Sequence, residues 1–120
     1  MDAFYALADP KRRMIVELLA KNGELAAGDI YKNFEITAQA VSQHLGILRE
    51  SGLLLMEKRG QQHIYRINRE SILELDGWAR ETARLWDARL DALEKVLKEE
   101  KNNNAKKVIL WQKQAKSQKS

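Results

Sequence analysis

The sequence contains no cysteine, and its 120 residues include a single proline. The absence of cysteine excludes disulfides, thiolate metal sites and thiol nucleophiles. No apolar run approaches the roughly 18 residues that a membrane-spanning helix needs, and the N-terminus has no signal-peptide pattern. We therefore expect a cytoplasmic protein without membrane insertion, built as one modest domain with room for a helical extension.

Acidic residues are absent from the last twenty positions, and this makes the charge uneven. Residues 101–120 carry six lysines and no acid, whereas residues 1–100 carry 15 basic and 17 acidic side chains. The overall charge of +4 thus comes from the end of the chain. Any anion-binding surface elsewhere must arise from local clustering of charge.

Hydrophobic spacing predicts four helices in the first half of the chain. A short helix and a longer one are expected within FYALADPKRRMIVELLAKNGE, with Asp9 as N-cap and Pro10 at the first helical position. A short helix follows in AAGDIYKNF. The fourth helix begins after Thr37, its N-cap, and ends at Ser51-Gly52, where glycine suits a left-handed cap.

The spacing then changes to that of strands. LLLMEKRGQQHIYRIN predicts two strands around a turn at Arg59-Gly60-Gln61. After Asn68, a candidate N-cap, residues 69–100 read as one long helix, and most of the Asn-, Lys- and Gln-rich remainder is expected to be disordered. The sequence therefore predicts a mostly α fold with a small β-hairpin. Residues 1–98 are expected to form a winged helix-turn-helix domain that includes a long C-terminal dimerisation helix, and residues 99–120 a basic disordered tail.

The fourth helix lies within TAQAVSQHLGILRESGLL, residues 37–54, and has an uncharged polar side opposite its apolar side. Gln39, Ser42 and Gln43 share this polar side. A Gln amide can pair with N6 and N7 of adenine in a major groove, and a hydroxyl can serve several bases. Taken alone, such a face is more often solvated surface, and this interpretation is favoured until other features are considered.

The predicted hairpin changes this balance, because it places Lys58, Arg59 and Gln61 at its tip. A wing at this distance from a recognition helix meets the DNA backbone or a minor groove, although an exposed turn is the alternative. The helix N-terminus also favours a phosphate beside Thr37. The residues predicted to contact DNA are Thr37, Gln39, Ser42, Gln43, His44, Lys58, Arg59 and Gln61.

For His44 and for the basic cluster near Pro10, the sequence permits two interpretations each. His44 either donates a hydrogen bond to a phosphate or packs half-buried at the helix flank. Lys11, Arg12 and Arg13 either touch phosphates or pair with nearby acids such as Glu17, and the second interpretation is favoured.

The long helix carries an apolar stripe that exceeds what a domain of this size covers. An overhanging stripe is expected to find a second copy, with packing inside one subunit as the alternative. The residues predicted at the dimer interface are Phe4, Leu7, Leu75, Trp78, Trp86, Leu90 and Leu93. The apolar run at 108–111 either docks on a partner or a membrane, or belongs to a frayed end.

Three stretches occur in the order and spacing of a known family: ALADPKRRMIVELL, AVSQHLGILRESGLL and RGQQHIYRIN. With them, residues 3–98 resemble the ArsR family of bacterial winged-helix repressors. The resemblance implies a homodimeric repressor on an imperfect inverted repeat of double-stranded DNA. It also implies that residues 37–44 read the DNA and that the hairpin is the wing.

Many members of that family sense metals, but the metal-binding positions are changed in this sequence. The family motif Glu-Leu-Cys-Val-Cys-Asp aligns with residues 24–29, where Ala26 and Gly28 replace both cysteines. A second family pattern needs histidine on the last helix, which has none. Since borderline metals prefer sulfur and imidazole ligands, we expect no metal and no cofactor. The chain then resembles the cysteine-free subgroup of SdpR-like autorepressors, of which the pair Trp78 and Trp86 is typical.

No catalytic constellation accompanies these features. A nucleophile triad, a catalytic carboxylate pair and a phosphate-binding glycine loop are all missing, so the sequence does not predict an enzyme. The expected function is sequence-specific transcriptional regulation. The alternative is a winged-helix protein-interaction module, an adaptor or anti-activator, without specific DNA readout. The sequence identifies neither an operator nor a protein or small-molecule inducer.

Overall fold

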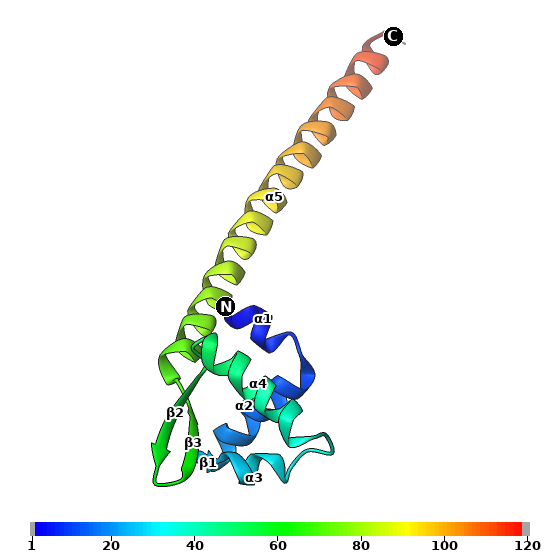
Figure 1. The fold of residues 1–120 in the computed structure, drawn as a ribbon. Helices are drawn as coiled ribbons and strands as arrows, with labels where there is room; N and C mark the ends of the chain where they lie inside the picture. The colour runs from blue at the N-terminus through cyan, green and yellow to red at the C-terminus, as the bar shows by residue number, and fades with distance from the viewer. Residues whose placement is uncertain (1, 119–120) are drawn as a thin grey trace. The chain divides into compact units, whose positions relative to one another are not determined.

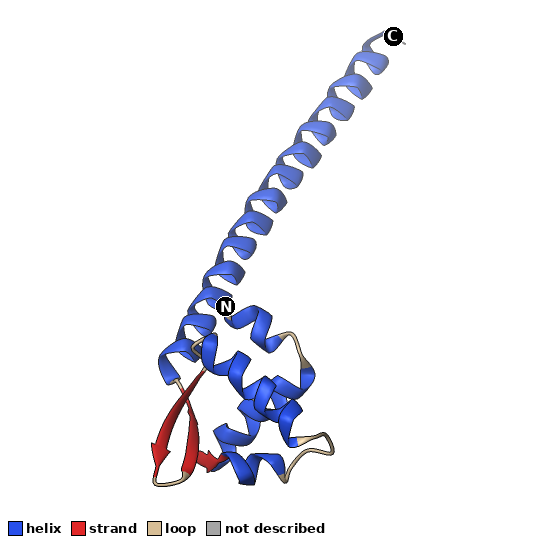
Figure 2. Ribbon diagram, viewed as in Figure 1, coloured by secondary structure: helices blue, strands red, loops and turns tan. Residues whose placement is uncertain are grey.

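The computed structural model of the protein describes residues 2–118, and it describes the side chains of residues 2–114. The chain divides after Gly77 into two compact units; helix α5 begins in the first and forms the second. The described residues form helices α1 (Ala3–Leu7), α2 (Pro10–Asn22), α3 (Ala27–Tyr31), α4 (Ala38–Glu50) and α5 (Arg69–Gln118), and strands β1 (Glu24–Ala26), β2 (Leu54–Arg59) and β3 (Gln62–Ile67) (Figure 1). The predicted class, mostly helix with a small antiparallel β part, is confirmed (Figure 2).

The helices begin and end where local chemistry predicts. The carboxylate of Asp9 accepts hydrogen bonds from the backbone N–H groups of Lys11 and Arg12 at 2.8 and 3.2 Å, at the start of α2. The hydroxyl of Thr37 accepts from the N–H of Ala40 at 3.1 Å and caps α4. Gly52, just after α4, has a φ of +84°, a conformation that glycine adopts without strain.

The three strands form one antiparallel sheet with β3 in the centre. Strand β2 pairs with β3 from Leu54 opposite Ile67 to Arg59 opposite Gln62, and Gly60 turns the hairpin with a φ of +60°. Strand β1 pairs with the other side of β3, with Glu24 opposite Arg66. The sequence did not predict β1, because three residues are too few for a two-residue period to show.

A single hydrophobic cluster holds α1 to α4 and the start of β2 together. Burial of each large aliphatic side chain contributes about 1.5–3 kcal/mol, so this cluster fixes α4 against its neighbours. Its members are Ala6, Ile15, Leu19, Ile30, Val41, Leu45, Leu48, Leu53 and Leu54.

Helix α5 is longer than predicted, because it continues to Gln118 through residues for which the sequence predicts disorder. No proline or glycine follows Gly77, and Ala, Leu, Lys and Gln are favourable helix formers, so nothing stops the helix at Glu100. The side chains of residues 78–114 are all exposed in the single chain. The division into a domain over 1–98 and a tail over 99–120 stays a prediction. Within the described part of the chain, no helix combines the length and apolar character that a bilayer crossing requires.

Candidate nucleic-acid interface

Helix α4 separates its apolar and polar side chains as the sequence predicts. Val41, Leu45 and Leu48 are fully buried. Of the five residues predicted to contact DNA from this helix or its cap, four are exposed: Thr37, Gln39, Ser42 and Gln43. A rigid helix therefore presents amide and hydroxyl groups outward, at the spacing of about one turn that a major groove accommodates.

Gly46 extends this exposed face by one turn. A Cβ built at Gly46 would meet no atom within 4 Å, so the protein's own packing does not require glycine there. Because glycine has no side chain, nothing projects from the outer face of α4 at this position, and another molecule could approach the backbone closely.

His44 lies at the flank of α4, half-buried, and Arg12 connects it to α2. The Nη1 atom of Arg12 is 3.4 Å from Nδ1 of His44. Arg12 is itself buried, and its guanidinium donates to the carbonyls of Ala6 at 2.7 Å and Tyr5 at 3.3 Å. The packing interpretation of His44 thus gains a specific partner, while its role toward a phosphate stays a prediction.

In the basic cluster at the start of α2, the side chains of two residues contact other parts of the protein. Arg12 lies 4.0 Å from the carboxylate of Asp9, and Arg13 donates to the carbonyl of Leu7 at 3.0 Å. These partners take the place of the predicted Glu17. Lys11 is exposed.

At the wing, Arg59 is held by two carboxylates. Its Nη1 donates to Oε1 of Glu24 at 2.6 Å, and its Nη2 donates to Oε2 of Glu24 at 3.1 Å and to Oε2 of Glu57 at 3.0 Å. These hydrogen bonds lower the pKa of Glu24 below its ordinary value, and the carboxylates raise the pKa of Arg59. Arg66 lies 3.8 Å from the same oxygen of Glu57. The other predicted wing residues, Lys58 and Gln61, are exposed.

The sequence did not reveal the roles of Glu24 and Glu57. Glu57 precedes Arg59 by two residues on one strand, so their proximity has a local signal, since alternate strand residues share a face. Glu24 is 35 positions away and reaches Arg59 only because β1 pairs with β3.

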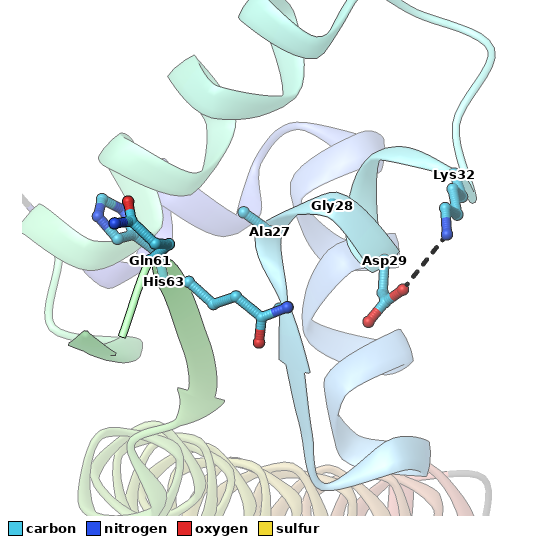
Figure 3. Close-up of a pocket in the computed structure, with 8 residues that line it drawn as sticks. Ala27, Gly28, Asp29, Lys32, Gln61 and His63 are labelled. Carbon is cyan, nitrogen blue, oxygen red and sulfur yellow. Dashed lines mark ion pairs between the residues drawn. The ribbon is translucent and has the colours of Figure 1, made fainter. Parts of the chain in front are cut away.

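An open hollow of about 460 Å³ lies between the start of α3 and the wing (Figure 3). Ala27, Gly28 and Asp29 line one side, and Gln61 and His63 line the other. Asp29 pairs with Lys32 at 3.7 Å, as the dashed line in Figure 3 marks. The positions where the resemblance places thiolates carry small side chains here, and no cluster of three metal-ligating side chains occurs among the described residues.

The residues predicted at a dimer interface divide into two groups. Leu7 and Leu75 are half-buried and pack against the hydrophobic core of the first unit. The others remain largely exposed in the single chain: Phe4, Trp78, Trp86, Leu90 and Leu93, with exposed fractions from 44% to 58%.

Comparison with known proteins shows clear relatives. The family model for "Bacterial regulatory protein, arsR family" matches residues 9–54, from the cap of α2 to the start of β2. The transcriptional repressor SdpR of Bacillus subtilis is 35% identical over 77 residues, covering 64% of this chain and 84% of that protein. The arsenical resistance operon repressor of Escherichia coli is 43% identical over 65 residues, covering 54% of this chain and 56% of that one. The structure of an ArsR-like transcriptional regulator from Rhodococcus sp. RHA1 superposes with a TM-score of 0.70 at 26% identity, covering 78% of this chain and 87% of that one.

Proposed function

The chain belongs to the ArsR family of winged helix-turn-helix transcriptional regulators, and we propose that it is a homodimeric repressor binding an imperfect inverted repeat in double-stranded DNA. One observation carries the proposal. The buried side of α4 is locked into the core, while its opposite side exposes Gln39, Ser42 and Gln43. These are side chains that can read base edges.

The two glutamines are the base-reading candidates, because an amide can donate to N7 and accept from N6 of adenine at once. Thr37 lies at the N-terminus of α4, where the helix dipole and free N–H groups favour a phosphate. Lys58 and Gln61 would contact the backbone or minor groove from the wing, and such contacts fix the register of a complex without carrying sequence information.

Dimerisation is the second part of the proposal. Trp86, Leu90 and Leu93 share one stripe of α5 and are about half exposed in the single chain. A second copy would cover this stripe and place two α4 helices on successive half-sites. Two weak half-site contacts then combine into one specific complex.

The repressor would not sense metal through thiolates, because Ala26 and Gly28 stand at the family's cysteine positions. Its inducer stays unidentified. Repression would take place in the cytoplasm, where bacterial DNA is found.

Selection of bound duplexes from a random pool tests this proposal. An enriched inverted repeat that binds two chains supports it. A pool that stays random, at a salt concentration where the protein still binds, contradicts specific readout. The second candidate is a protein-binding adaptor, and it is favoured by the ion pairs that Arg59 forms with Glu24 and Glu57, because these leave Arg59 less available to DNA. A protein that binds no duplex in the same experiment would support that candidate instead.

A further inference from the structure

The wing carries less positive charge than its sequence indicates. Glu24, Glu57, Arg59 and Arg66 form one connected set of ion pairs with distances from 2.6 to 3.8 Å, and their formal charges cancel. Within the described part of β1 and the hairpin, Lys58 is therefore the cation whose charge these carboxylates leave uncompensated.

Arg59 has also used most of its directional hydrogen-bonding capacity. A guanidinium has five N–H donors, of which Arg59 directs one from Nη1 and two from Nη2 to carboxylate oxygens. The paired arrangement with Glu24 is the geometry in which an arginine would grip a phosphate. A phosphate of DNA must therefore displace Glu24 to bind Arg59 in that way.

The set is not buried, which limits its contribution to folding. The side chains of Arg59, Glu24 and Glu57 are 48%, 44% and 52% exposed. Ion pairs this exposed to water contribute little to stability, so stability does not account for two carboxylates at the wing. Their exposure does place them where an approaching DNA backbone would meet them.

We propose that Glu24 and Glu57 are positioning residues that compete with DNA phosphates for Arg59, and so keep the wing's contribution to DNA affinity low. The proposal rests on the proposed DNA binding. The two carboxylates prevent Arg59 from contacting a phosphate, and their negative charge also repels the DNA backbone directly. They act on every duplex alike, so they set how strongly the protein binds DNA, while α4 sets which sequence it prefers.

Substitution of Arg59 alone cannot test the proposal, because it would remove the proposed phosphate ligand and leave both carboxylates at the wing. The informative variant is Glu24→Gln with Glu57→Gln, which keeps side-chain size and removes both charges. Glu17→Gln, on the exposed side of α2, is the control for the loss of a carboxylate away from the wing. A third variant adds Arg59→Gln to the glutamine pair. Dissociation constants for a random duplex are measured for all proteins from 50 to 200 mM salt.

The double variant is expected to bind more tightly than the wild type, with a salt dependence steeper by about 0.9 for each copy of the chain bound, which corresponds to one additional phosphate per copy. Its advantage over the wild type should then shrink by about threefold per bound copy between the two salt concentrations. Glu17→Gln should leave the slope unchanged, and the added Arg59→Gln should return it to the wild-type value. Equal slopes in the wild type and the double variant would overturn the competition while leaving DNA binding intact. Failure of both to bind any duplex would overturn the competition and the proposed function together.

Discussion

The guanidinium of Arg12 lies 3.4 Å from Nδ1 of His44, so a buried cation of α2 contacts the flank of the helix that faces outward for recognition. Because arginine can only donate, a hydrogen bond here requires the tautomer of His44 in which Nδ1 is the acceptor. The same guanidinium donates to the carbonyl of Ala6 at 2.7 Å, just before the end of α1. One side chain therefore ties α1, α2 and α4 together.

Replacing Arg12 should cost stability. Arg12→Met keeps an unbranched stem but leaves the buried carbonyl of Ala6 without its donor, so the free energy of unfolding should fall by about 1–3 kcal/mol. Urea unfolding at fixed protein concentration measures the change. The neighbouring substitution Arg13→Met is the control, since Arg13 is exposed, and it should stay within about 0.5 kcal/mol of the wild type. If the free energy of unfolding fell equally in the two variants, the contacts of Arg12 would not account for its contribution to stability.

Gln43 should carry base preference. Gln43→Ala is expected to cost about 1–3 kcal/mol on the selected operator at one base pair per half-site, and little on random DNA, because an alanine cannot pair with a base edge. Competition binding against single-base variants of the operator measures this. Lys58→Ala is the contrasting variant: it should weaken all duplexes alike and reduce the salt slope by about 0.9 for each copy of the chain bound. If Gln43→Ala weakened operator and random DNA equally, Gln43 would not be a base-reading residue.

The stripe on α5 should determine the oligomeric state. Leu90→Asp places a charge in the proposed interface, and Trp86→Ala removes a large apolar side chain from it, so both should give monomers with a folded first unit. Sedimentation equilibrium at micromolar concentration measures the mass. Ala88→Asp, about 200° around the helix from Leu90, adds the same charge on the other side and should leave the dimer intact. A wild-type monomer at this concentration would rule out the interface.

The contact between Glu24 and Arg59 should make the free energy of unfolding depend on pH in the acidic range. Hydrogen bonds from Arg59 lower the pKa of Glu24 below its ordinary value of 4.5. A carboxyl whose pKa is lowered by folding stabilises the protein above the unfolded value, and this contribution is lost as the pH falls through the folded value. The difference in unfolding free energy between wild type and Glu24→Gln should therefore be largest near neutral pH and vanish below the folded pKa. A difference independent of pH would show that charge is not its cause.

Features encoded by neighbouring residues could be predicted from the sequence. Asp9 and Thr37 cap helices through backbone groups two or three positions away, and Gly52 and Gly60 adopt the conformations that their turns require. The division of α4 into a buried and an exposed side follows from the spacing of its leucines and glutamines.

Features that depend on distant residues could not be predicted. Arg12 meets His44 across 32 positions, and Arg59 meets Glu24 across 35. The sequence predicts a DNA contact for Arg59, because its local pattern shows a cation at a glycine turn, and this contact stays a prediction. The carboxylate that pairs with Arg59 comes from a three-residue strand with no sequence signal of its own. The sequence also predicts too early an end for α5, because its polar composition after Glu100 is typical of disorder, whereas the helix continues to Gln118.

The central claim is that the outer face of α4 reads DNA sequence. Its most direct test compares two dissociation constants of the wild-type protein, one for the selected operator and one for a shuffled duplex of equal length. At about 150 mM salt we expect the operator to bind at least about a thousandfold more tightly. We also expect both affinities to fall as salt increases. Equal affinity for the two duplexes across the salt range would contradict the account, because the exposed glutamines of α4 would then contribute no discrimination.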